Sequence, residues 1–349
     1  MLNSPDGKFS AGFPAAARLN VSHAPMFETR ESKKPAATSN SAASPGVFRG
    51  IIPPMITPLR DRDTLDVEGL QRLVEHLIAG GVHGIFALGT TGEAPSLSHR
   101  LRQEVVRATL DFARQRVPVL VGITDTSFTE SVELASLCAT TGAAGVVTAP
   151  PYYFPAGQPE LCEYLDDLAA ELPLPLFLYN MPSMTKVSIE LSTVQHAMRN
   201  PKVIGIKDSS GDMIHLHRLV ELSRQRPDSW SVLIGPEELT AEAVLLGAHG
   251  GVNGGANVHP RLYVQLYEAA TAGDLPRIRE LQRQVLDLAG QLYTVGRHRS
   301  SLIKGVKCAL NLLGICHDGM AEPFRSFREP ERAIVRERLV RLGLLNPKA

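Results

Sequence analysis

The chain has 349 residues, 36 lysines and arginines against 36 aspartates and glutamates, and 44% hydrophobic residues. A net charge of zero removes the electrostatic basis for binding nucleic acid or an anionic membrane surface. Four cysteines without a C-x-x-C pair argue against a disulfide scaffold and structural zinc, and predict a cytoplasmic, reducing location. No apolar run approaches the roughly 18 residues that a membrane span needs.

Residues 1–46 differ from the rest of the chain. They are rich in Ser, Ala, Pro and Asn and have no periodic apolar face. Such a segment cannot bury enough apolar surface to offset the entropy lost on ordering, so we expect a disordered N-terminal tail. A targeting signal is the alternative. However, polar residues interrupt any apolar h-region, and Asp6, Glu28 and Glu31 are unfavourable in a transit peptide.

From residue 47 onward, short apolar runs alternate with amphipathic helical patterns. The runs are continuous rather than alternating, which is typical of parallel strands buried on both faces. We therefore predict an α/β fold, a (β/α)₈ TIM barrel over residues 47–272. An open doubly wound sheet is the alternative, but no G-x-G-x-x-G follows the first strand. The predicted strands are 51–57, 84–88, 118–122, 145–148, 176–179, 203–206, 231–234 and 250–253.

The helices predicted between these strands each have one apolar face. They cover residues 67–79, 99–114, 129–141, 159–171, 189–198, 213–225, 239–246 and 260–272. Three more helical patterns follow, at 275–293, 300–313 and 330–342. They are too long for loops and carry apolar faces, so we predict a C-terminal three-helix extension over residues 273–349.

In a barrel of this kind the functional groups lie where strands end, because the strand-to-helix loops converge on one face. Several polar side chains occupy such positions. They are Thr90 and Thr91 after the second strand, Tyr153 after the fourth, Tyr179 ending the fifth, Lys207 ending the sixth, and Glu237 and Glu238 after the seventh.

Lys207 supports the most specific hypothesis. It ends the apolar run 203–206, where the barrel walls would desolvate its amine, and an uncharged amine attacks carbonyl groups. A Schiff base is the chemistry that fits. A lysine with its stem on apolar surface and its head in water is the alternative. The company of Tyr179 and of Thr90–Thr91 favours the Schiff base.

Tyr179 and the two threonines would serve that chemistry. Tyr179 could pass a proton to and from the carbinolamine oxygen, or could simply cap the core with a bonded hydroxyl. Thr90 and Thr91 lie between glycines and offer hydroxyl and backbone N–H groups that suit a carboxylate. A polar turn is the alternative for this pair.

Four short motifs at these strand ends are similar to a known family. They are GTTGE at 89–93, PYY at 151–153, YNMP at 179–182 and GIKD at 205–208. In this order they resemble the dihydrodipicolinate synthase/N-acetylneuraminate lyase family of class I aldolases, and the resemblance covers residues 47–345. It implies a pyruvate Schiff base on Lys207, with Tyr179 as the proton-transfer residue. No cofactor or metal is implied, because the protonated imine is itself the electron sink.

The same resemblance implies further roles. Thr90 and Thr91 would hold the pyruvate carboxylate, and the backbone at Val252 would line the site. Tyr153 matches a tyrosine that completes a proton relay across a subunit contact, together with the threonine that matches Thr90. Family members are usually homotetramers built as dimers of dimers, so we expect a homotetramer here.

The substrate is harder to predict. The synthases carry an arginine where this chain has Met184, and a thioether cannot replace a cationic fork that binds a carboxylate. Glu237 and Glu238 match two acidic residues that accept sugar hydroxyls in sialic acid lyases, and Ser209 matches another sugar-contacting position. Alternatively, the two glutamates lie in the first turn of a helix and complement its dipole.

We therefore predict a class I aldolase that joins pyruvate to an aldehyde or cleaves the reverse product, with a 2-keto-3-deoxy sugar acid as the favoured substrate. The alternatives are a 4-hydroxy-tetrahydrodipicolinate synthase acting on pyruvate and aspartate semialdehyde, a keto-deoxy-acid dehydratase, and a keto-acid-binding sensor without turnover. Metal-dependent chemistry lacks its ligands, since no H-E-x-x-H occurs among the 11 histidines. The expected partners are small molecules and copies of this chain.

Overall fold

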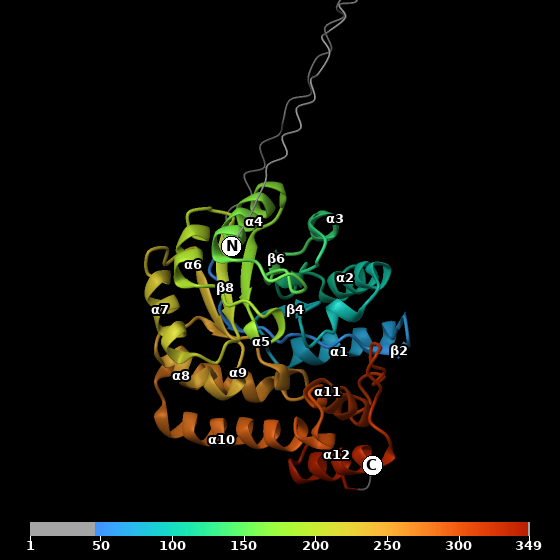
Figure 1. Ribbon diagram of the computed structural model, residues 1–349. Helices are drawn as coiled ribbons and strands as arrows, with labels where there is room; N and C mark the ends of the chain where they lie inside the picture. The colour runs from blue at the N-terminus through green and yellow to red at the C-terminus, as the bar shows by residue number, and fades with distance from the viewer. Residues whose placement is uncertain (1–45, 348–349) are drawn as a thin grey trace, which may run out of the picture. The chain divides into compact units, whose positions relative to one another are not determined.

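The computed structural model describes residues 46–347. The tail predicted for residues 1–46 lies outside them except for Gly46. Within the described range, eight parallel strands form one sheet in the order β1-β10-β9-β8-β7-β6-β5-β4 (Figure 1). Their bounds are β1 Gly50–Ile51, β4 Ile85–Ala87, β5 Val119–Gly122, β6 Gly145–Thr148, β7 Leu176–Asn180, β8 Val203–Asp208, β9 Ser231–Ile234 and β10 Gly250–Gly251.

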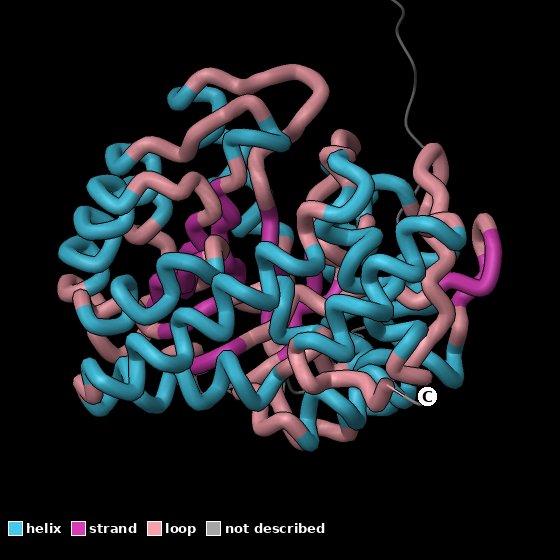
Figure 2. The backbone as a smooth tube through the Cα atoms, turned by 90° about the horizontal axis from the view of Figure 1, so that it is seen from below, coloured by secondary structure: helices cyan, strands magenta, loops and turns pink. Residues whose placement is uncertain are grey.

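The sheet closes on itself through the segment after β1. Pro54 bridges to Phe86 in parallel, the Met55 N–H donates to the Phe86 carbonyl at 2.9 Å, and the Phe86 N–H donates to the Pro53 carbonyl at 2.9 Å. Figure 2 shows the strands enclosed by helices. This confirms the predicted (β/α)₈ barrel. The first strand is shorter than predicted, because Pro53 and Pro54 have no N–H to give to the sheet.

Helices follow the strands and cover the outside of the barrel. Their bounds are α1 Val67–Ala79, α2 His99–Ala113, α3 Phe128–Thr141, α4 Gln158–Glu171, α6 Leu191–Ala197, α7 Met213–Ser223, α8 Thr240–Leu245 and α9 Pro260–Ala272. Besides short 3₁₀ turns, the sequence did not predict the antiparallel pair β2 Leu59–Asp61 and β3 Thr64–Leu65 or the short helix α5 Pro182–Thr185. Asp66 and Asp212 accept backbone N–H bonds and so begin α1 and α7.

The inside of the barrel has a hydrophobic cluster of its own. It consists of Phe48, Ile52, Phe86, Leu120, Val147, Ala149, Phe177, Tyr179, Ile204, Leu233 and Val252. Because these side chains come from successive strands, the barrel is filled rather than hollow. A second, larger cluster lies between the strands and the surrounding helices and continues into the C-terminal extension.

The C-terminal extension consists of α10 Leu275–Leu292, α11 Ser301–Leu312 and α12 Glu329–Arg341, which confirms the three predicted helices. In Figure 1 these helices, orange to red, lie along one side of the barrel. α10 packs against α9, and α11 contacts both α10 and the short turn Gly254–Asn257 after β10. The extension therefore contacts the barrel on the face where the carboxyl end of β10 lies.

Three general features bear on function. No helix within residues 46–347 is long and apolar enough to cross a membrane. The four cysteines, all in the described part of the chain, are free thiols. The same part of the chain contains no group of three or more His, Cys, Asp or Glu side chains placed to hold a metal ion.

Candidate active site

A cavity of about 240 Å³ opens at the carboxyl ends of β4, β5, β6 and β7. This is the face on which barrel chemistry is expected. Most of its wall is apolar, and the polar groups are hydroxyls of threonine and tyrosine. The lining residues are Phe86, Leu88, Gly89, Thr90, Ala94, Pro95, Gly122, Thr124, Ala149, Tyr152, Tyr179, Met181, Met184 and Thr185.

Lys207 lies beside two of the aromatic rings that line this cavity. Its Nζ is 4.0 Å from the centre of the Tyr179 ring and 5.1 Å from the centre of the Phe86 ring. Lys207 is 5% exposed and Tyr179 is 6% exposed. The two residues are paired directly across β7 and β8. A buried amine thus lies against the face of a tyrosine ring.

The Tyr179 hydroxyl is embedded in polar contacts. It lies 3.2 Å from Thr90 Oγ1. Burial alone would raise the pKa of Tyr179, but the charge of Lys207 and hydrogen bonds with Thr90, Lys207 and Ser209 outweigh burial and hold that pKa below its ordinary value of 10.0. The structure therefore brings Thr90, Tyr179, Lys207 and Ser209 together, and a tyrosine that releases its proton more readily is suited to proton transfer.

An amide–carboxylate bond one residue further along the strands fixes this register. Asn180 Nδ2 donates to Asp208 Oδ1 at 2.7 Å, and both residues are fully buried. Asn180 and Asp208 are partners across β7 and β8, next to the Tyr179–Lys207 pair. The bond resists any slip between the two strands, and such a slip would separate Lys207 from Tyr179. Neither Asn180 nor Asp208 was assigned a role from the sequence.

Hydrogen bonds to Thr57 and within the loop hold the segment 89–93 in place. Thr57 Oγ1 donates to the Gly92 carbonyl at 2.7 Å, and the Glu93 N–H donates to the Thr90 carbonyl at 3.0 Å. A side chain at Gly92 would meet the Met55 carbonyl, so this position requires glycine. Thr91 is partly buried on this loop. The loop is thus fixed by bonds outside the cavity, which leaves the Thr90 hydroxyl to face Tyr179.

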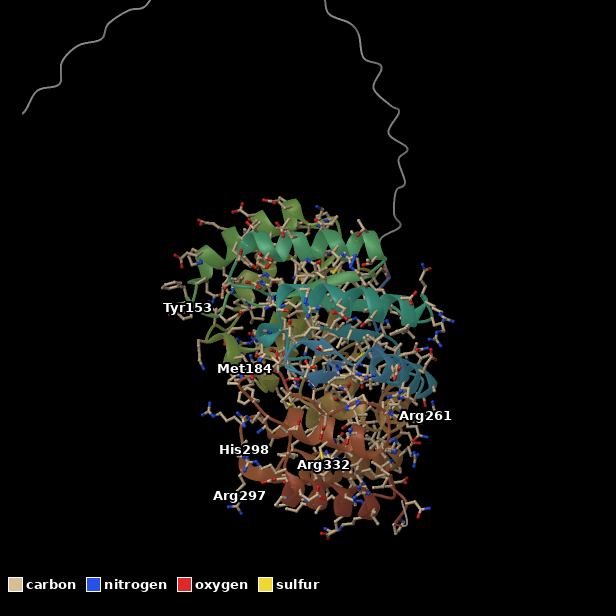
Figure 3. The ribbon with its side chains drawn as sticks, turned by 90° about the vertical axis from the view of Figure 1, so that its right-hand side faces the viewer. Tyr153, Met184, Arg261, Arg297, His298 and Arg332 are labelled. Carbon is tan, nitrogen blue, oxygen red and sulfur yellow. The ribbon has the colours of Figure 1, made fainter. Side chains whose placement is uncertain are left out.

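Val252 and Tyr153 lie in contrasting places. Val252 is buried in the barrel interior, in the same cluster as Tyr179, and does not line the cavity. Tyr153 is 77% exposed, packs edge-to-face against Phe154 at 5.2 Å between ring centres, and points outward in Figure 3. The neighbouring Tyr152 lines the cavity instead. Within one chain, therefore, Tyr153 is not part of the constellation around Lys207.

Met184 lies at the rim of the cavity, on the same side of the molecule as Tyr153 in Figure 3. It is carried by α5 and is 55% exposed. Neither it nor any other lining residue is an arginine or a lysine. The residues that line the cavity therefore offer no cation to a second carboxylate, although the exposed Lys186 follows α5 nearby.

Glu237 and Glu238 do not line the cavity. Glu237 is buried, and its carboxylate accepts hydrogen bonds from the Gly255 N–H at 2.8 Å, Tyr263 Oη at 2.7 Å and Tyr293 Oη at 2.8 Å. Glu238 is exposed. The carboxylate of Glu237 thus accepts hydrogen bonds that join the end of β9 to α9 and to the end of α10. The expected contact with sugar hydroxyls has no support from this geometry.

The buried position of Glu237 leads to a prediction about stability. Burial raises its pKa from 4.5 to about 7, despite the three hydrogen bonds that it accepts. Because the folded-state pKa lies above the unfolded value, the folded protein is favoured most below pH 4.5 and loses this advantage as pH rises through 7. The loss is of the order of 3 kcal/mol, at about 1.4 kcal/mol per pKa unit. Glu237→Gln is expected to remove that part of the pH dependence in urea unfolding.

The matched control for this prediction is Glu238→Gln, which changes the exposed neighbouring carboxylate. It is expected to keep most of the pH dependence of the unfolding free energy, because the charge of Glu238 makes only the smallest contribution to the raised pKa of Glu237. If the unfolding free energy changes with pH equally in Glu237→Gln and in the wild type between pH 4.5 and 7, the result would contradict the assignment of a raised pKa to Glu237.

Most residues that line the cavity were given no role from the sequence, and Phe86 and Tyr152 are the two aromatic examples. Phe86 supplies the second ring beside Lys207, and Tyr152 lines the wall. Burial and the charge of Asp125 raise the pKa of Tyr152. Phe86 reads in sequence as an ordinary core residue of a strand. Tyr152 could have been found from the sequence, because it directly precedes Tyr153 at the same strand end.

Comparisons with known proteins agree with the fold. The model of the dihydrodipicolinate synthetase family matches residues 47–341. A 4-hydroxy-tetrahydrodipicolinate synthase of Methanopyrus kandleri is 34% identical, over 85% of this chain and 97% of its own length. The solved dihydrodipicolinate synthase of Bacteroides thetaiotaomicron has 56% identity and a TM-score of 0.82, covering 84% of this chain and 98% of that one.

A prophage protein of the dihydrodipicolinic acid synthase family from E. coli K12, solved in complex with pyruvate, is 30% identical with a TM-score of 0.80 and covers 85% of this chain and 99% of that one. The family model and these relatives confirm the resemblance inferred from the four strand-end motifs. The chain therefore belongs to the dihydrodipicolinate synthetase family and is a class I lyase of that family.

Proposed function

We propose that this protein forms a Schiff base between pyruvate and Lys207 and joins the resulting enamine to an aldehyde. The observation that carries the proposal is the buried group of Lys207, Tyr179 and Thr90, with Nζ 4.0 Å from the Tyr179 ring and the two hydroxyls 3.2 Å apart. The pyruvate-bound relative from E. coli K12 supports pyruvate as the first substrate. The chemistry requires no metal or organic cofactor, because the imine nitrogen accepts the electron pair.

The reaction can be written from these residues. Lys207 Nζ attacks the carbonyl carbon of pyruvate, and Tyr179 passes a proton from the nitrogen to the oxygen, which gives a carbinolamine. Tyr179 then donates its own proton to this hydroxyl, which leaves as water, so that a protonated imine and the Tyr179 phenolate form. The Tyr179 phenolate accepts a methyl proton to give the enamine, whose carbon attacks the aldehyde and forms the new C–C bond while the aldehyde oxygen takes that proton back from Tyr179. Water then hydrolyses the imine, which releases the product and restores the amine. Hydroxyl and N–H groups of Thr90 and Thr91 hold the pyruvate carboxylate, and Val252, buried in the cluster that contains Tyr179, has no direct part in this scheme.

Tyr153 enters this proposal through a second copy of the chain. Its ring and that of Phe154 pack against each other and are both largely exposed. Exposing two adjacent aromatic rings to water is unfavourable, and a contact with another subunit would bury them. We infer a homotetramer in which Tyr153 of one subunit approaches the Thr90 hydroxyl of another and completes the proton relay to Tyr179.

The aldehyde partner has two candidates. The names of the curated relatives favour aspartate semialdehyde and the 4-hydroxy-tetrahydrodipicolinate synthase reaction. Met184 at the rim favours instead an aldehyde without a carboxylate, such as the product released from a 2-keto-3-deoxy sugar acid. The sugar acid takes second place, because Glu237 is bonded elsewhere and Ser209 alone remains of the three sugar-contacting positions. Dehydration through the same imine would follow if the substrate carried a suitable leaving hydroxyl.

Pyruvate consumption with a panel of aldehydes separates these candidates: aspartate semialdehyde, glyceraldehyde, glyoxylate and N-acetylmannosamine. A preference for aspartate semialdehyde establishes the synthase reaction, and a preference for N-acetylmannosamine or glyceraldehyde establishes the second candidate. If pyruvate is not consumed with any of these aldehydes, the result would contradict aldol condensation.

Met184→Arg tests the rim directly. A charge-assisted bond to a carboxylate is worth about 1.5–3 kcal/mol, so the KM for aspartate semialdehyde is expected to fall by roughly tenfold or more, with an unchanged KM for pyruvate. Met184→Gln is the control, since it is similar in length and carries no charge. An identical KM in the arginine and glutamine variants would show that position 184 does not face the aldehyde.

A further inference from the structure

A buried ion pair joins the C-terminal extension to the loop that carries Thr90. Lys307, on α11, forms an ion pair with the Glu93 carboxylate, and its Nζ also donates to the Gly319 carbonyl at 2.6 Å. The second carboxylate oxygen of Glu93 accepts the Ala321 N–H at 2.9 Å. Lys307 is 0% exposed, and Glu93 is also buried. Two groups from the extension therefore hold one side chain of the GTTGE loop.

The backbone of Glu93 is in a conformation that needs such support. Its φ is +58°, in the left-handed region that residues other than glycine adopt rarely and at a cost. The Glu93 N–H donates to the Thr90 carbonyl at 3.0 Å, so the turn at Glu93 sets where Thr90 lies. Thr90 in turn places its hydroxyl 3.2 Å from that of Tyr179. One chain of contacts thus leads from Lys307 to the reacting groups.

We propose that Lys307 is a positioning residue for the reaction, which acts through Glu93 to hold Thr90 against Tyr179 and in place for the substrate carboxylate. The proposal rests on the proposed function of Thr90 and Tyr179. It gives the extension a part in catalysis in addition to its share of the core. Breaking a buried ion pair by removing one partner leaves the other charge uncompensated, so the turn at Glu93 is expected to rearrange in its absence.

The test compares Lys307→Met with Arg338→Gln. Arg338 also ties the extension together, through the Gln291 carbonyl and Thr294, but does not contact Glu93. In Lys307→Met we expect kcat/KM for pyruvate to fall by about 10- to 100-fold, the loss typical of a small misplacement of reacting groups. Amide hydrogen exchange within 89–93 should accelerate. In Arg338→Gln we expect a lower melting temperature, kcat/KM within about twofold of the wild type, and unchanged exchange at 89–93.

Two outcomes would overturn the proposal: a folded Lys307→Met protein with wild-type kinetics and exchange at 89–93, or equal kinetic losses in the two variants. If Lys307→Met does not fold, Glu93→Gln serves instead. It keeps an acceptor for the Ala321 N–H but removes the charge that Lys307 binds, and the same losses are expected. If the wild type forms no borohydride-trapped adduct with pyruvate, the proposed function fails, while the exchange measurement still tests the coupling.

Discussion

Replacing Lys207 by arginine is expected to abolish turnover, with kcat falling by roughly 10⁴-fold or more, because the covalent intermediate cannot form. Arginine keeps the positive charge and most of the length, but its guanidinium stays protonated and is not a nucleophile. The fold should persist, since the rings of Phe86 and Tyr179 can still pack against a cation. Pyruvate consumption with the best aldehyde measures kcat, and circular dichroism checks the fold.

Lys186→Arg is the matched control for this variant. Lys186 is exposed and lies directly after α5, near the cavity rim. Its amine donates a hydrogen bond to the Ser183 carbonyl. Its replacement is expected to leave kcat within about twofold. Substantial turnover by a folded Lys207→Arg protein would mean that the nucleophile is another residue.

Removing the Tyr179 hydroxyl should have the next largest effect. Tyr179→Phe is expected to lower kcat by about 10²- to 10³-fold, the usual contribution of a positioned proton carrier. The ring remains, so its edge-to-face packing on Phe86 and its contact with Lys207 persist and the protein should fold normally. Since the pKa of Tyr179 is lowered, the wild-type rate should fall on the alkaline side at a pH below 10, and this limb should be missing from the variant.

Tyr152→Phe is the control for the second prediction, because it removes a tyrosine hydroxyl from the same cavity without touching Lys207. Its kcat is expected to stay within a few-fold of the wild type. An equal loss in the two variants would indicate that the cavity needs polar groups in general rather than a proton carrier at position 179.

The sequence predicted the barrel because each buried strand is encoded locally. Continuous apolar runs that end in a polar residue specify both the strand and the end that faces the cavity, so the amino-acid pattern alone was enough to place Lys207 beside Tyr179. The same pattern overextended the first strand, where Pro53 and Pro54 interrupt the ladder of hydrogen bonds. Helix α5 was missed, because its single turn is too short to show periodicity.

Long-range partners could not be predicted in the same way. Glu237 looked available to a sugar because the two hydroxyls that bond to it, on Tyr263 and Tyr293, lie much further along the chain. Glu93 was given no role of its own from the sequence, yet it is bonded to Ala321, 228 residues further along the chain. A local pattern indicates which side chains reach a strand end, but only tertiary packing decides whether they face the cavity or the surrounding helices.

The central claim is the covalent bond between Lys207 and pyruvate. Borohydride reduces an imine to a stable amine, so the most direct measurement is treatment with pyruvate and borohydride followed by peptide mass spectrometry. We expect loss of activity and a reduced pyruvyl group on the peptide that contains Lys207, dependent on both reagents and absent from Lys207→Arg. No adduct at saturating pyruvate, or an adduct on a different lysine, would contradict this mechanism.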